Sequence, residues 1–267
     1  MSRPKTIPFV IYFLVLVVPI IIASCVRMQD YTPSAPLTRD QVHQILSTLI
    51  AQSEQAESFI SSGRLKVKVD KSEFNANILL AGTKFPFRIK MEVTHRWGRP
   101  LFHILIYGTK IQIVSYQEKR CYIQQLGSSD ISGLFPASLT SDQVWGLARG
   151  YPTIAKYNTA ILQQTDQILL LTAKGKAIQA VRLLPGSRLP SLTIFPNQGI
   201  KISFQNYNKI AGVYYAKRIG IDYPKAAITW SLDIRQVSFN GYIPEEVFNL
   251  EIPSGFEIMP SSKQTIP

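Results

Sequence analysis

Past Gly63, apolar residues recur at every second position for most of the remaining chain, and this alternation restricts the fold more than any other feature. Leu65, Val67 and Val69, for example, alternate with Arg and Lys residues. An extended strand turns successive side chains to opposite faces, so this period is typical of half-buried antiparallel strands with one apolar face. The sequence therefore predicts a mainly β protein.

A helix is expected just before the first strand. Thr38, with Gln41 three residues later, forms a capping-box signal, and apolar residues from Val42 to Ile60 recur near the helical period. One apolar face on a helix of that length has to pack on a core, and its own domain is the simplest choice. The segment 101–107 is apolar on both faces, so this helix is a candidate to cover its outer face.

Two short helical patterns interrupt the strands, at residues 130–135 and 141–148. Strand patterns then resume and continue to a last short one at 247–252, and the tail from Pro253 is expected to be poorly ordered. About eleven antiparallel strands with an N-terminal helix and a two-helix insertion predict a mainly β, α+β fold. We expect an incomplete antiparallel β-barrel with the helices closing its concave side.

The N-terminus is typical of an export signal. Two basic residues precede an uncharged apolar run at 7–22, and small residues lead to Cys25. The sequence Ile-Ala-Ser-Cys at 22–25 resembles the lipobox, whose cysteine is acylated after cleavage. A membrane-spanning anchor or an ordinary signal is the alternative, but about 20 apolar residues are needed to cross the hydrocarbon. Residues 1–24 are therefore predicted to be a lipoprotein signal peptide, and Cys25 the lipidation site.

The segment after the cysteine predicts a tethered domain. Residues 25–36 are polar and are expected to form an acylated tether, followed by one domain at 37–259 and a flexible tail at 260–267. Val26 stands where many Gram-negative lipoproteins of the inner membrane carry Asp. The expected location is therefore the bacterial outer membrane rather than the inner membrane, with the lipid-anchored domain facing the periplasm.

The formal net charge of +12 raises the question of nucleic-acid binding. The basic residues are spread along the chain, and no nucleic-acid-binding motif accompanies them, so we expect no nucleic-acid partner. A basic surface beneath an acyl anchor suits anionic lipid headgroups, because each nearby cation adds about 1 kcal/mol of attraction. A merely solvated basic face explains the charge equally well.

Catalytic chemistry has little support in the sequence. His43, His95 and His103 are the only histidines, and no metal-ligand spacing, Gly-x-Ser-x-Gly motif or phosphate-binding loop is present. Cys121 has no disulfide partner if Cys25 is acylated, and its apolar neighbours indicate a buried structural thiol. We expect a protein that is not an enzyme and that uses no metal or cofactor.

Several segments resemble the LolA/LolB-like superfamily of outer-membrane lipoproteins over residues 37–259. They are Gly63–Val67, Ala81–Gly82, Phe87–Val93, Trp97–Phe102 and the insertion around Leu134–Phe135 and Trp145–Leu147. The resemblance implies a half-barrel whose apolar cavity holds acyl chains of a lipoprotein or lipid, in outer-membrane lipoprotein or lipid transport or insertion. It implies no cofactor. Expected partners are membrane lipids and either acylated lipoproteins or a periplasmic carrier protein, and we expect a monomer.

The resemblance also assigns a membrane contact to one loop. In the receptor branch of that superfamily, an exposed apolar residue before a glycine, after the third strand, is thought to dip into the membrane. Trp97 lies at the matching place, between Arg96 and Arg99 and before Leu101, although the superfamily's residue is Leu. An indole ring and cations suit the bilayer interface. The alternative is that Trp97 folds back and caps the barrel rim.

The inward-facing apolar residues are expected to line the cavity, although an error of one residue would exchange the two faces of a strand. They are Leu65, Val67, Phe74, Ile78, Phe87, Ile89, Met91, Leu105, Ile202, Phe204, Tyr215, Trp230 and Leu232. The alternative is a packed core without a cavity. The domain would then be an anchored scaffold or assembly subunit that binds proteins through a strand edge or through the insertion around Phe135 and Trp145.

Overall fold

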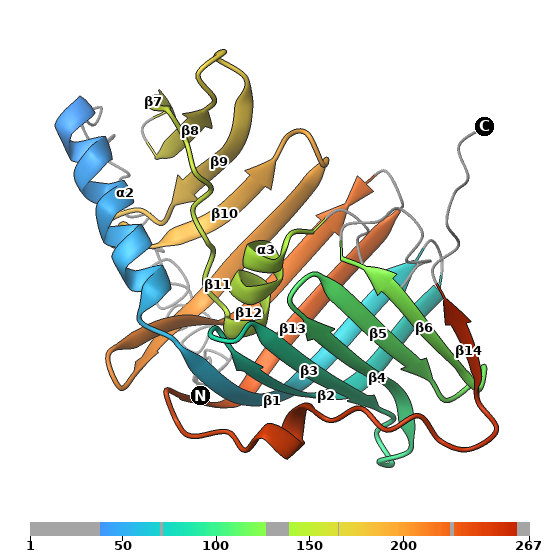
Figure 1. Cartoon of the computed structure of the whole chain (residues 1–267). Helices are drawn as coiled ribbons and strands as arrows, with labels where there is room; N and C mark the ends of the chain where they lie inside the picture. The colour runs from blue at the N-terminus through green and yellow to red at the C-terminus, as the bar shows by residue number, and fades with distance from the viewer. Residues whose placement is uncertain (1–37, 70–71, 127–138, 165, 225–226, 261–267) are drawn as a thin grey trace, which may run out of the picture. The chain divides into compact units, whose positions relative to one another are not determined.

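The computed structural model describes residues 38–69, 72–126, 139–164, 166–224 and 227–260. These residues form one open sheet of 14 strands that bends around two α-helices (Figure 1). The mainly β prediction is confirmed, but the expected count of about eleven strands is wrong. The described residues all belong to one compact unit.

The sheet consists of two antiparallel meanders. The strands are β1 Ser58–Val69, β2 Ser72–Thr83, β3 Arg88–Thr94, β4 Pro100–Tyr107, β5 Lys110–Ser115, β6 Arg120–Gln125, β7 Thr159–Gln164, β8 Gln167–Leu171, β9 Ala177–Leu183, β10 Pro190–Phe195, β11 Ile200–Ile210, β12 Val213–Tyr223, β13 Ile228–Phe239 and β14 Glu257–Pro260. Their order is β14-β6-β5-β4-β3-β2-β1-β13-β12-β11-β10-β9-β8-β7. The meander β1 to β6 joins the meander β7 to β13 where β1 pairs with β13, and β14 adds to β6 in parallel.

Helix α2, Arg39–Glu54, begins at the predicted capping box. Thr38 Oγ1 accepts a hydrogen bond from Gln41 N, and Gln41 Oε1 accepts one from Thr38 N. The buried face of α2 packs on β7, β8 and β9, so the expectation that it covers residues 101–107 is wrong. The helix also ends sooner than its period suggests, because β1 already begins at Ser58.

The chain between β13 and β14 covers the outer face of β4 instead. Leu105 packs there with Ile243 and Phe248, and the 3-10 helix η2, Glu245–Phe248, lies in the same segment. The predicted strand at 247–252 is therefore wrong. A proline followed by two glutamates favours a helical turn at this place. The chain forms its last strand later, as β14, inside the tail that is expected to be poorly ordered.

Helix α3, Ser141–Arg149, confirms the second predicted helix of the insertion. It begins at a capping box of Thr140 and ends at Gly150, whose φ of 78° is in the left-handed region that glycine adopts freely. The first predicted helix, at 130–135, lies outside the described residues, as do the signal peptide, Cys25 and the tether.

The main core lies between α3 and the concave face of the sheet. Val144 and Trp145 of α3 belong to one buried apolar cluster with residues of β2 to β5 and β10 to β13. A second cluster lies under α2. None of the helices in the described ranges combines the length and hydropathy needed to span a bilayer. The arrangement leaves part of the concave face, beside α3, without a helix on it.

Candidate apolar cavity

The concave face holds a cavity of about 330 Å³ beside α3. This volume is within the range of about 300–1,000 Å³ that is typical of ligand pockets. The wall comes from β1 to β4, β12 and β13, the β5–β6 turn and one face of α3. Its residues are Leu65, Val67, Val69, Phe74, Ile78, Leu80, Met91, Val93, Leu101, Phe102, Ile104, Gln117, Val144, Leu147, Ala148, Ile219, Ile221, Trp230 and Leu232. Gln117 is the one polar residue of this set.

The structure places only some of the predicted lining residues in this wall. Those in the wall are Leu65, Val67, Phe74, Ile78, Met91, Trp230 and Leu232. Leu65 and Leu232 face each other across the β1–β13 junction, so both meanders contribute to one wall.

The remaining predicted lining residues lie elsewhere. Ile89, Ile202, Phe204 and Tyr215 are buried in the main core, and Phe87 packs against that core, because α3 fills this part of the concave face. Leu105 points to the opposite face. Its strand is apolar on both faces, and its neighbours Ile104 and Ile106 are the residues that face inward at this point of β4.

An aromatic cluster lies next to one end of the cavity. The ring of Trp145 lies 5.2 Å from that of Phe59 and 6.3 Å from that of Phe87, measured between centroids. Gly82 permits this packing, because a β-carbon there would lie 2.5 Å from the Phe59 ring and 3.2 Å from Trp145. The lining residues of β2 end at Leu80, and Gly82 is the next residue on the same face. The aromatic cluster therefore lies beyond the last lining residue of β2, on the same face of that strand.

The other end of the cavity is open to solvent. Val69, at the end of β1, and Gln117, in the β5–β6 turn, both line the cavity and are exposed. The β3–β4 turn lies beside this end, since the ring of His95 contacts that of Phe74 at 6.3 Å.

The structure tests the geometry of the predicted membrane-contact loop. Trp97 is 91% exposed, so the alternative that it folds back onto the rim is wrong. Arg96 and Arg99 are also exposed. Leu101 differs from the prediction: it is buried in β4 and lines the cavity, because the strand already begins at Pro100. The loop thus presents one indole between two cations.

Sequence reasoning missed the contribution of α3 and β12 to the wall. Val144, Leu147 and Ala148 line the cavity from α3, at the spacing of one helix face. Ile219 and Ile221 line it from β12, and their alternation was a usable signal. The α3 face was not assigned because a short helix pattern does not show which surface it covers.

A buried arginine ties α3 to α2. Arg149 Nη1 donates to Ser53 O and Nη2 to Gln52 O, each at 3.3 Å. These carbonyls lie at the C-terminal end of α2, which carries a partial negative charge. Burial lowers the pKa of Arg149 to about 10, and the Tyr151 ring lies 4.9 Å from the guanidinium. These hydrogen bonds connect the C-terminal end of α3 to the C-terminal end of α2.

Among the described residues, no three or more His, Cys, Asp and Glu side chains come together in a group that could hold a metal ion. His43 lies on α2 and His95 in the β3–β4 turn. His103 lies on β4, with Nδ1 3.0 Å from Tyr116 Oη, and burial lowers its pKa. Cys121 is buried, as predicted, and burial raises the pKa of its thiol.

Solved structures with the same arrangement are known. A DUF1329 family protein from Desulfovibrio piger has a TM-score of 0.52 at 11% sequence identity, over 79% of this chain and 97% of that one. A putative outer membrane lipoprotein-sorting protein domain from Vibrio parahaemolyticus has a TM-score of 0.52 at 14% identity, over 77% and 95% of the two chains. The chain has a LolA/LolB-like fold.

A LolA superfamily protein from Nitrosomonas europaea is also similar, with a TM-score of 0.45 at 14% identity over 78% of this chain and 97% of that one. The sequence matches no protein-family model and no curated protein. At these identities the LolA/LolB-like likeness concerns the fold, and the ligand has to be inferred from the cavity itself.

Proposed function

We propose that this chain is a membrane-anchored, periplasm-facing lipoprotein that binds acyl chains of a lipoprotein or lipid in its apolar cavity. Its role would be in outer-membrane lipoprotein or lipid transport or insertion. The observation that carries the proposal is the cavity of about 330 Å³, apolar except for Gln117 and open at one end. The LolA/LolB-like fold supports it.

The size and polarity of the cavity suit one acyl chain. A methylene group is similar in size to a water molecule, whose share of the liquid is about 30 Å³, so the cavity accommodates about ten methylenes. Each methylene taken out of water contributes about 0.8 kcal/mol. The gross gain of about 8 kcal/mol lies within the range of about 4–15 kcal/mol estimated for the cost of association, so a chain is retained when this cost lies in the lower part of the range.

Under this proposal, the protein would contact the membrane at two places. Acylation of Cys25 would hold the protein on the outer membrane, and Trp97 would enter the headgroup region during transfer. The exposure of Trp97 beside the open end of the cavity supports this second contact, because a chain leaving the cavity would meet the bilayer there. Arg96 and Arg99 would meet lipid phosphates.

Lipid extraction and mass spectrometry on residues 26–267, exported without the acyl anchor, test the proposal. We expect about one acyl lipid per chain. Leu232→Glu places a charge in the cavity wall and should remove the lipid, whereas Thr229→Glu, on the exposed face of the same strand, should retain it. A folded wild-type domain that carries no lipid and ignores fluorescent fatty acids would contradict the proposal.

The alternative is an anchored scaffold that binds protein partners. Trp145 is 2% exposed, so it cannot take part in such a surface, and Phe135 lies outside the described residues. Two other aromatic side chains favour a protein contact, because both are largely exposed to solvent. The exposed fraction is 81% for Phe85 and 87% for Tyr242. Alanine at both positions should leave lipid content unchanged and abolish co-purification of a partner if this second function holds.

A further inference from the structure

The open end of the cavity is flanked by two turns that carry basic side chains. The β3–β4 turn, residues 95–99, carries Arg96 and Arg99, and the β5–β6 turn, residues 116–119, carries Lys119. All three side chains are exposed. We call Arg96, Arg99 and Lys119 the rim cations.

The two turns are neighbours in space. Tyr116 N, in the second turn, donates a hydrogen bond of 3.0 Å to Leu101 O, two residues after the first turn. Leu101 and Gln117 both line the cavity. A group at the mouth of the cavity therefore lies between the turns that carry the rim cations.

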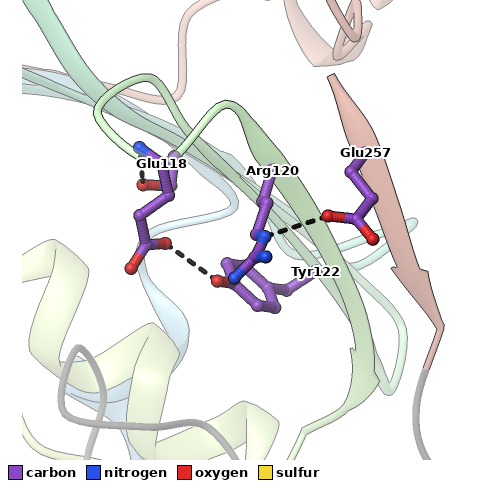
Figure 2. Close-up of polar contacts among 5 residues, drawn as sticks. Glu118, Arg120, Tyr122 and Glu257 are labelled. Atoms are coloured by element: carbon purple, nitrogen blue, oxygen red, sulfur yellow. Dashed lines mark hydrogen bonds and ion pairs between the residues drawn. The ribbon is translucent and has the colours of Figure 1, made fainter. Parts of the chain in front are cut away.

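The acidic side chains at this place have partners other than the rim cations. Figure 2 shows that the Glu118 carboxylate accepts a hydrogen bond of 2.8 Å from Tyr122 Oη, and that Arg120 Nε donates one of 3.1 Å to Glu257. Among the described residues, none forms an ion pair with a rim cation. Tyr122 is a neutral partner, so Glu118 keeps its negative charge, and the three rim cations together leave the mouth of the cavity with a net positive charge.

We propose that the cavity selects an acyl lipid with a negatively charged headgroup, a carboxylate or a phosphate. The inference rests on the proposed function, because it assumes that the chain occupies the cavity. The acyl chain lies between the two meanders with its end toward Trp145, and the headgroup stays at the mouth. The rim cations attract the anion, and the exposed amide of Gln117 donates a hydrogen bond to it.

The charge arrangement sets the size of the effect. A cation near an anionic headgroup strengthens binding by about fivefold, and three exposed cations in salt give a combined preference of at least about tenfold. The same chain attached to a neutral or cationic headgroup gains nothing from the rim cations. Headgroup charge, at constant chain length, therefore separates this inference from the proposed function.

The experiment measures binding of four ligands with the same dodecyl chain to residues 26–267, by isothermal titration calorimetry below the critical micelle concentrations. The ligands are dodecanoate, dodecyl phosphate, dodecyl maltoside and dodecyltrimethylammonium. The test variant replaces the three rim cations by glutamine. The control variant, Lys174→Gln, Lys176→Gln, Arg188→Gln, removes the same charge from exposed positions that do not line the cavity.

We expect both anionic ligands to bind at least about tenfold more tightly than the other two, and the test variant alone to lose this preference. Equal binding of all four ligands by the wild-type protein, or a preference that survives in the test variant, would overturn the inference and leave the proposed function intact. If none of the four binds, both fail.

Discussion

Replacement of Trp145 by alanine should lengthen the cavity. We expect the indole to limit the length of the chain at the end opposite the rim, because it packs against Gly82, two residues beyond the lining residue Leu80, and its removal leaves space there. In the wild-type protein, affinity should rise about fourfold for each added methylene until the chain reaches Trp145, and then stop rising. In Trp145→Ala the rise should continue for a few more methylenes.

The same substitution has a predictable cost in stability. A buried Trp replaced by Ala costs about 3–5 kcal/mol. Trp145 should be near the lower value, because its Nε1 has no hydrogen-bond partner among the described residues, and a buried unpaired donor itself costs about 1–3 kcal/mol. At about 2–4 °C per kcal/mol for a domain of this size, Tm should fall by about 6–12 °C.

Thermal unfolding and calorimetry with a series of fatty acids of increasing length measure both effects. Trp145→Phe is the matched control, because it keeps most of the ring contact with Phe59 and removes the unpaired N–H. It should cost little stability and shift the length limit only slightly. A folded Trp145→Ala protein with an unchanged length limit would refute the reasoning that the indole closes the cavity.

Three further predictions follow from single side chains. Trp97→Ala should weaken binding of residues 26–267 to anionic vesicles by about tenfold. It should change the free energy of unfolding by less than about 0.5 kcal/mol, since Trp97 is exposed. Equal vesicle binding by the variant and the wild-type protein in a flotation assay would contradict this prediction. Burial lowers the pKa of His103 below its usual value, so the folded protein resists protonation of this side chain. The contribution of the neutral imidazole to stability is therefore complete above about pH 6.5 and is lost as the pH falls below that value. The urea midpoints of His103→Phe at pH 7.5 and 5.5 should differ less than those of the wild-type protein. Gly150→Ala should cost at least about 2 kcal/mol, from the positive φ and from a β-carbon 2.9 Å from Ala216 O, and an unchanged Tm would count against it.

The sequence predicted the elements that depend on local signals. The capping box at Thr38 and Gln41 is present as expected, and so is α3. Strand β1 was expected too late, because Phe59 and Ile60 continue the helical spacing of α2 although they already belong to the strand. Nothing between Glu54 and Ser58 marks the change, since no Gly or Pro interrupts the chain there.

The site was harder to predict than the fold, because it depends on contacts between distant segments. The alternation of apolar residues correctly predicted that Leu65 and Leu232 face inward. It does not show that α3 covers Phe204 and leaves Leu232 uncovered. The parity of Leu105 was ambiguous because its strand is apolar on both faces. Only the path of the chain after β13 decides which face of that strand meets the cavity.

The pairing of β1 with β13 has a consequence for how the protein is made. Leu65 meets Leu232 about 170 residues later in the chain, and both halves of the cavity wall depend on this junction. Contacts so distant in sequence form slowly, because the chain between them must first be ordered. Under the proposed function, a chain synthesised from its N-terminus would complete the cavity wall only after β13 has formed, so an incomplete copy would not bind lipid and lipid binding would indicate a finished molecule.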